Sequence, residues 1–183
     1  MKRLIVACSV LVILALVAVF PRAQSANPMM DAVKAQWTPI KGYVLRTAAK
    51  VPDNVYAFRA TPEVRTFAEI LGHIIDAQSM FCSTASGEKG PQFNAEKTLT
   101  TKAQLSKALD ETTAFCDKVI AGMDDKKGAE NIKFFIGGSS PRALILSFNT
   151  GHSYEHYGNL VTYMRLNKIV PPSSEPAPGR GGE

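Results

Sequence analysis

The sequence predicts an all-α protein, a four-helix bundle with long crossover connections between some of its helices. Four segments carry apolar residues at the spacing of one helical face, which is the pattern of helices packed in a bundle. Residues that favour helix starts precede these segments, and no convincing strand pattern accompanies them. The connection between the second and third helices and that between the third and fourth each run to roughly fifteen residues, which is long enough to cross the bundle.

The first 25 residues have the order of a secretory signal peptide. Met1-Lys2-Arg3 precedes an uncharged, mostly apolar stretch over residues 4–20, and Ala23 and Ser25 supply small residues for cleavage. We therefore expect residues 1–25 to be removed and the protein to be periplasmic or secreted. The apolar stretch exceeds the roughly 7–15 residues typical of a leader, so an uncleaved membrane anchor is the alternative.

Cleavage changes the charge and the expected partners. It removes Lys2, Arg3 and Arg22 but no acidic residue, so the formal charge falls from +5 to +2. No basic patch with interleaved aromatic residues remains, which argues against a nucleic-acid partner. We expect one domain over residues 26–170, without stable membrane insertion after cleavage, and a homodimer is compatible with it.

Two cysteines remain once the leader with Cys8 is lost. Cys82 and Cys116 can form a disulfide in an oxidising compartment, and they can equally remain two buried thiols. Their spacing does not decide between the two states.

The first two helices are expected over residues 27–49 and 66–83. Asn27 is a candidate cap and Pro28 suits the first helical position, whereas Pro39 predicts a kink or a broken turn. Residues 51–65 contain two prolines and no helical period, so they form a connection. The second helix has a wide apolar face, as burial in a bundle requires.

The last two helices begin at recognisable caps. Thr101 and Gln104 have capping-box spacing, and the helix that follows stops near Gly122. Ser140-Pro141 is expected to open the fourth helix, which runs to Asn167. Residues 132–136 can form a strand, but no partner strand is apparent. Residues 171–183 have so little apolar content that burial could not offset the conformational entropy lost on ordering, and they are expected to be disordered.

All three histidines of the chain lie on predicted helices. His152 and His156 are four residues apart and share one helical face, and His73 lies among core-facing residues of the second helix. Three imidazoles suit a divalent transition metal, with zinc or nickel favoured, and leave coordination positions open. The alternative is three hydrogen-bonded histidines without a metal. Leaving each imidazole unsatisfied costs roughly 1–3 kcal/mol, which a shared metal removes.

The sequence resembles the DinB-like metal-binding family. The resemblance is carried by the Trp37 helix, Tyr56-Ala57-Phe58, residues 63–74 and residues 152–165. It implies a bundle with up-down-down-up order and a metal held by His73, His152 and His156. It also implies a metal-dependent hydrolase or transferase acting on an unknown small molecule. A thiol-dependent reaction fits less well, because an exported member is separated from cytosolic thiols.

Several side chains are expected near the histidines. At 100° per residue, Phe148, Glu155, Asn159 and Tyr163 lie near the direction of His152, and Glu69, Asp76, Ala77 and Met80 lie near that of His73. A carboxylate there can orient a ligating imidazole or act as a general base. Glu155 is the candidate catalytic residue, although a surface or orienting role fits both Glu155 and Asp76.

Three other functions remain open. One is a non-catalytic, metal-dependent binding or scaffold module. Another is a zinc peptidase, because residues 152–156 match H-x-x-E-H; such enzymes take a further acidic ligand from well downstream, and only a short tail follows His156. The third is a haem bundle, for which the C-x-x-C-H attachment motif is absent.

Overall fold

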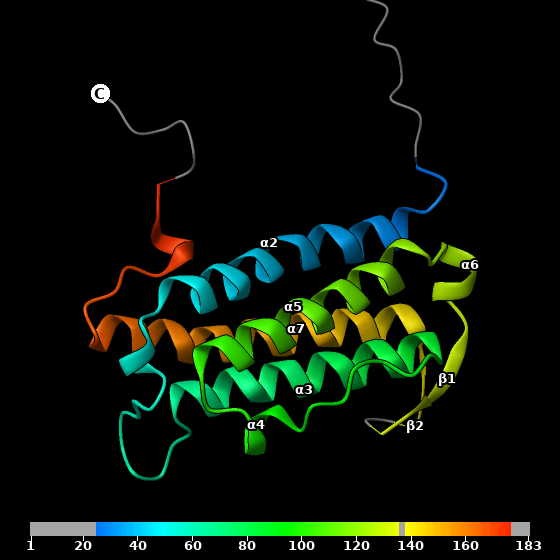
Figure 1. The fold of residues 1–183 in the computed structure, drawn as a ribbon. Helices are drawn as coiled ribbons and strands as arrows, with labels where there is room; N and C mark the ends of the chain where they lie inside the picture. Colours follow the sequence, from blue (N-terminus) through cyan, green and yellow to red (C-terminus); the bar gives the residue numbers. More distant parts are fainter. Residues whose placement is uncertain (1–24, 136–137, 177–183) are drawn as a thin grey trace, which may run out of the picture.

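A computed structural model describes residues 25–135 and 138–176. Four long helices make up most of it: α2 (Pro28–Lys50), α3 (Phe67–Ser86), α5 (Lys102–Ala121) and α7 (Arg142–Leu166). Figure 1 shows them packed side by side, as expected of a four-helix bundle. The signal-peptide prediction, apart from Ser25, lies outside the described residues.

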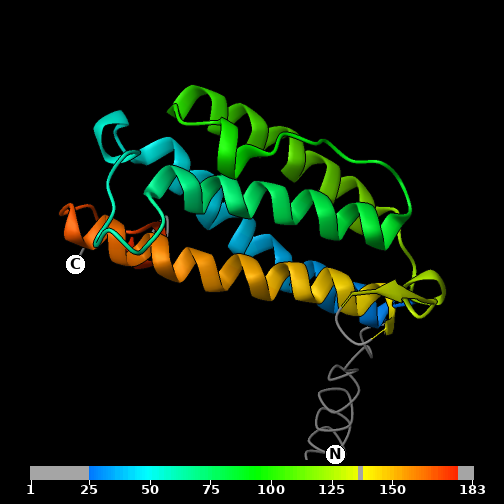
Figure 2. The ribbon, with the colours of Figure 1, turned by 90° about the horizontal axis from the view of Figure 1, so that it is seen from below.

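Two of the four long helices run in each direction (Figure 1). Arg142 at the start of α7 donates from Nη1 to the carbonyl of Ala85, near the end of α3, and the Tyr163 hydroxyl, late in α7, donates to the carbonyl of Arg65, just before α3. These contacts make α3 and α7 antiparallel. In Figures 1 and 2, α2 runs with α7 while α3 runs with α5, which is up-down-down-up order.

Large apolar side chains from all four helices meet in one core. α5 contacts α2 and α3, and α7 contacts the same two helices. Burying such side chains is the main favourable term in folding. The large side chains that are almost fully inaccessible include Trp37, Ile40, Phe67, Leu71, Ile74, Leu105, Leu109, Ile145, Leu146 and Leu160.

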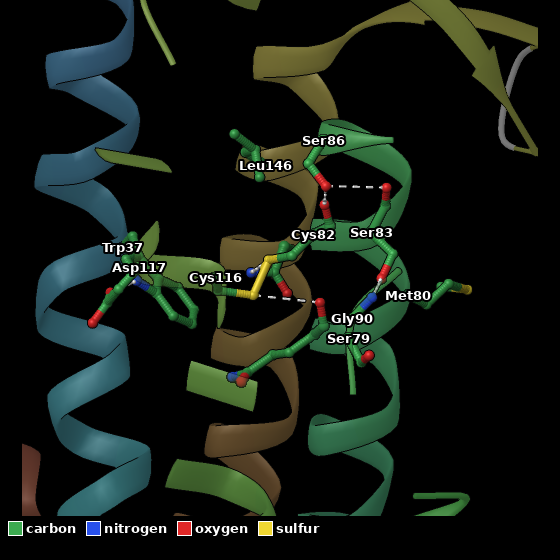
Figure 3. The surroundings of a disulfide bond; sticks show 12 residues. Trp37, Ser79, Met80, Cys82, Ser83, Ser86, Gly90, Cys116, Asp117 and Leu146 are labelled. Atoms are coloured by element: carbon green, nitrogen blue, oxygen red, sulfur yellow. Dashed lines mark hydrogen bonds between the residues drawn. A yellow bond between two sulfur atoms is a disulfide. The ribbon is translucent and has the colours of Figure 1, made fainter. Parts of the chain in front are cut away.

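A disulfide joins the C-terminal halves of α3 and α5. Cys82 and Cys116 are bonded, with their Cα atoms 5.4 Å apart, and neither residue is exposed (Figure 3). The structure thus selects the bridge from the two states that the sequence left open. The two cysteines are 34 residues apart, and closing a loop of this length in the unfolded chain is worth about 4 kcal/mol in the chain-entropy model.

α2 is a single helix that continues through Pro39, so the predicted broken turn is absent. Its start is held by one side chain from α6 (Asp125–Gly128): the carboxylate of Asp125 accepts from the amides of Met29 and Met30 at 3.0 and 2.8 Å. Asn27 does not cap α2 through its side chain, which instead accepts from the amide of Asp125. The cap therefore comes from another element of the fold.

The connection before α7 contains a β-hairpin that the sequence did not predict. β1 (Asn131–Phe134) pairs antiparallel with β2 (Gly138–Pro141), so the expected lone strand has a partner. Ser140 is part of β2, and α7 starts at Arg142 without a side-chain cap, so the predicted Ser140 cap is wrong. Gly138 has φ +79°, which favours glycine at the start of the second strand.

The beginning of the C-terminal tail packs on the bundle. Pro172 is buried in the short helix η2 (Pro172–Ser174), and Ser173 exchanges hydrogen bonds with the Tyr157 hydroxyl. The expected disorder is therefore wrong for residues 171–176, because prolines already restricted in φ lose little entropy on docking. The same prediction for residues 177–183 lies outside the described part of the chain.

Within residues 25–135 and 138–176, no helix combines the length and the apolar content that a membrane span requires.

Candidate metal centre

The first turn of α3 fixes where His73 falls. The Thr66 side chain accepts from the amide of Glu69 at 3.1 Å, and the Glu69 carboxylate accepts from the amide of Thr66 at 2.6 Å. This reciprocal capping box sets the start of the helix, so His73 comes two turns later on the side facing α7. Glu69 caps α3 rather than orienting His73.

The three histidines converge through their Nε2 atoms. Nε2 of His152 lies 3.2 Å from Nε2 of His73 and 3.1 Å from Nε2 of His156. One ring nitrogen from each residue falls within 4.8 Å of the others. Nitrogens about 2.0–2.1 Å from one zinc ion at tetrahedral angles stand about 3.3 Å apart, so the observed spacing fits a shared metal.

A glutamate that the sequence did not single out orients His73. Oε2 of Glu96 lies 2.7 Å from Nδ1 of His73, and Oε1 of Glu96 accepts from Nε of Arg65 at 2.7 Å. Hydrogen bonds from Arg65 and His73 outweigh burial and lower the pKa of the Glu96 carboxyl, which is therefore ionised at neutral pH. A carboxylate at Nδ1 fixes the proton there and leaves the Nε2 lone pair free for a metal.

Glu96 stands on the short helix α4 (Ala95–Thr98), which α3 holds in place. The Asp76 carboxylate accepts from the amides of Ala95 and Glu96 at 2.8 and 3.0 Å, so it anchors α4 and does not orient His73 directly. Gly72 allows the close approach, since a Cβ there would come within 2.6 Å of the Glu96 amide nitrogen. Both residues thus act on His73 through Glu96.

The other two rings differ in their surroundings. Nδ1 of His156 lies 3.3 Å from the side-chain amide of Asn159. Nδ1 of His152 is buried and has no hydrogen-bond partner among the described residues. Burial, together with the neighbouring His156, His73 and Arg65, lowers the pKa of His152 to about 4. Burial and His73 also lower the pKa of His156, so both rings favour the neutral form that binds metals.

The donor set fits a divalent transition metal with an open coordination position. Three imidazoles form the cluster, and no fourth histidine, cysteine, aspartate or glutamate joins it in the part of the chain that the structure describes. Structural zinc sites usually have four protein ligands, whereas catalytic sites have three. An ion held here would supply Lewis-acid chemistry at its open position.

The remaining candidates of the sequence analysis lie around this cluster. Glu155 is exposed on α7 and makes no side-chain hydrogen bond among the described residues, so its catalytic role stays a prediction. Tyr163 faces Arg65, to whose carbonyl its hydroxyl donates at 2.6 Å. Glu96 was missed because it stands on a four-residue helix with no periodic signal, 23 residues from His73.

A pocket of about 420 Å³ opens beside two of the rings. His73 and His152 form part of its wall, together with Asp76 and five apolar side chains. Phe148, Met80 and Ala77, which the helical spacing placed near the histidines, all line it. The metal centre thus borders a space that a small molecule can enter.

The chain belongs to the DinB superfamily, whose sequence profile matches residues 41–160. The matched residues include His73, His152 and His156. Among proteins with curated descriptions, none matches the sequence.

Solved structures share the fold. A DinB-like protein from Bacillus cereus ATCC 10987 is 18% identical, with a TM-score of 0.68 over 78% of this chain and 95% of the other. A DinB-like protein from Bacillus subtilis is 17% identical, with a TM-score of 0.60 over 80% and 99%. The mycothiol-dependent maleylpyruvate isomerase is 12% identical, with a TM-score of 0.58 over 72% of this chain and 60% of the isomerase.

Proposed function

We propose that this DinB-superfamily protein is an exported metalloenzyme, a hydrolase or transferase that acts on a small molecule at His73, His152 and His156. The observation that carries the proposal is the convergence of three histidines beside an open pocket, with Nε2 of His152 at 3.1–3.2 Å from Nε2 of the other two. Zinc or nickel is the proposed ion, because imidazole nitrogens suit both.

The arrangement favours an enzyme over a scaffold. A structural metal site gains most from four protein ligands and a closed shell, whereas this cluster has three rings and borders a pocket. The chain's own groups then hold the site in one geometry: Glu96 orients His73, and Asn159 contacts His156. Such orienting contacts preorganise a site without occupying its open side.

Export is supported by two independent features. The first 25 residues have the order of a signal peptide, and the Cys82–Cys116 disulfide is typical of an oxidising compartment. The mycothiol dependence of the isomerase is not carried over, because an exported protein is separated from cytosolic thiols. The mass of the protein recovered from a bacterial periplasm should lack residues 1–25, and retention of these residues would contradict cleavage.

The peptidase alternative gains no support from the geometry. Its signature requires a further acidic ligand from downstream of His156, whereas the third ring in the cluster is His73 from an upstream helix. Glu155, which would activate water in such an enzyme, is exposed.

Turnover by the metal-loaded protein tests the proposal. The zinc and nickel forms should convert at least one member of a panel of carboxylic esters, amides, phosphoesters and thiol conjugates. His152→Ala should abolish that turnover, whereas Glu111→Gln, an exposed change on α5, should retain it. If the metal-loaded wild type turns over no compound of the panel, the result would favour the scaffold module instead.

A further inference from the structure

We propose that the ligand of this site carries a ring-sized apolar group, which lies in the pocket beside His73 and His152 while a Lewis-basic head group faces the three histidines. This inference deepens the proposed function and rests on it for the position of the head group. The apolar part of the pocket consists of Ala77, Met80, Phe81, Phe135 and Phe148.

The floor of the pocket is rigid and aromatic. Phe81 is 2% exposed, and its ring packs edge-on against Phe148 at a centroid distance of 5.3 Å. Phe134, which is also buried, lies 6.1 Å from Phe81 and 6.0 Å from Phe148. These contacts hold Phe81 and Phe148 in fixed orientations, so the pocket presents preformed aromatic faces to a ligand.

The walls leave apolar area uncovered. Met80, Phe135 and Phe148 are 43%, 69% and 39% exposed. Eight large hydrophobic residues are exposed in the described part of the chain, and three of them line this one pocket. Single exposed apolar side chains are ordinary on a protein surface, but a contiguous cluster of them indicates a binding site for an apolar ligand or partner.

The pocket is continuous with the metal centre. The ring centroid of His152 is 5.6 Å from that of Phe81, so the aromatic floor directly adjoins the cluster. Asp76 is the charged side chain in the lining, and its two oxygens already accept from the amides of α4. Among the described residues, the pocket lining therefore contains no cationic side chain that would bind an anionic group of the ligand. Its one carboxylate is already hydrogen-bonded, so it is not available to a cationic group.

The size of the pocket indicates the size of the group. A closed apolar cavity of about 150 Å³ accommodates benzene. This pocket has about 420 Å³ and is open to solvent, so it has room for a substituted ring. The ligand class is thus a small aryl or cycloalkyl compound with one electron-pair-donating head group.

Two hydroxamates that differ in the apolar group provide the test. Calorimetry on the zinc-loaded protein compares acetohydroxamate with phenylacetohydroxamate, which share a metal-binding head. The phenyl compound should bind about tenfold more tightly, because its ring leaves water. Phe148→Ala should reduce this preference to about threefold or less, with unchanged zinc content.

Tyr154→Ala is the matched control, because Tyr154 lies on the same helix, is 42% exposed and does not line the pocket. It should keep the wild-type preference. Equal affinity of the wild type for both hydroxamates, or an undiminished preference in Phe148→Ala, would overturn the inference.

A metal-free readout separates this inference from the proposed function. If elemental analysis finds no bound metal, the proposed function fails, and fluorobenzene binding followed by fluorine NMR decides on the pocket. Broadening of the fluorine resonance by the wild type and Tyr154→Ala, but not by Phe148→Ala, would support the apolar subsite. No broadening, or equal broadening by all three proteins, would overturn it.

Discussion

Glu96 hydrogen-bonds to the outward nitrogen of His73, with Oε2 2.7 Å from Nδ1. The pair joins a helix of only four residues to the centre of α3, and Arg65 binds the other oxygen of the same carboxylate. The orientation of His73 therefore depends on a connection between helices as well as on the bundle itself.

Removing this carboxylate should weaken metal binding. Glu96→Ala should raise the dissociation constant for zinc roughly 10–100-fold, because His73 loses the acceptor that fixes its ring and its proton. Glu96→Gln should have a smaller effect, since the amide oxygen can still accept from Nδ1. Competition with a chromogenic zinc chelator measures both. Wild-type affinity in Glu96→Ala would show that the contact is incidental.

A pair of glycines tests whether the position of α4 matters. Gly72 and Gly151 each precede a histidine of the cluster, but an added Cβ would collide with the α4 backbone only at Gly72. Gly72→Ala should therefore lower both stability and zinc affinity by displacing Glu96.

Gly151→Ala is the control for that change. An added Cβ meets no atom within 4 Å at Gly151, so alanine should stabilise α7 by roughly 0.5–1 kcal/mol and leave zinc affinity unchanged. Urea denaturation and the same chelator competition measure the two effects. Equal zinc affinities in the two variants would contradict the proposed role of α4.

Acid should destabilise the metal-free protein through the buried rings. Burial and the nearby positive charges lower the pKa of His152 from 6.5 to about 4 in the folded state. Between these values the unfolded chain binds more protons, so the contribution is fully present above pH 6.5 and is lost as the pH falls towards 4. Bound metal should steepen the loss, because protons compete for the same nitrogens.

Urea midpoints measured across this pH range check the effect. The midpoint of His152→Gln should fall less with decreasing pH than that of the wild type. Parallel pH profiles for the two proteins would contradict a depressed pKa at His152.

The disulfide should be formed in the mature protein and should stabilise it. Denatured protein without reductant should show no reaction of Cys82 or Cys116 with a thiol reagent. The double variant Cys82→Ala/Cys116→Ala should lose about 4 kcal/mol of unfolding free energy, which is the loop-closure entropy of the bridge. Modification of both cysteines without reductant would rule out the bridge.

Much of the fold could be predicted from local signals. Both α3 and α5 start at capping boxes whose partners are three residues apart. The box of α5 was identified from this spacing, whereas that of α3 was found only in the structure. The β-hairpin was missed because β2 is short and rich in serine, without apolar alternation; the Gly137-Gly138 pair was the available turn signal. The start of α2 depends on Asp125, far along the chain, which local patterns cannot reveal.

The candidate site was predictable to a similar extent. Helical spacing placed His152 beside His156, and the amphipathic pattern placed His73 on the core side of its helix. Sequence spacing could not identify Glu96. The approach of Glu96 to His73 depends on a tertiary contact through Gly72 and Asp76. Nor could sequence spacing assign Asp76, which it placed near His73 but which anchors α4 instead.

Metal content tests the central claim most directly. Protein purified without a nickel column and loaded with zinc should contain about one ion per chain, bound by about three nitrogens at roughly 2.0–2.1 Å in X-ray absorption spectra. His73→Ala, His152→Ala and His156→Ala should each lose it. Retention of a full equivalent of zinc by His73→Ala, or absence of zinc from the wild type, would contradict a shared three-histidine centre.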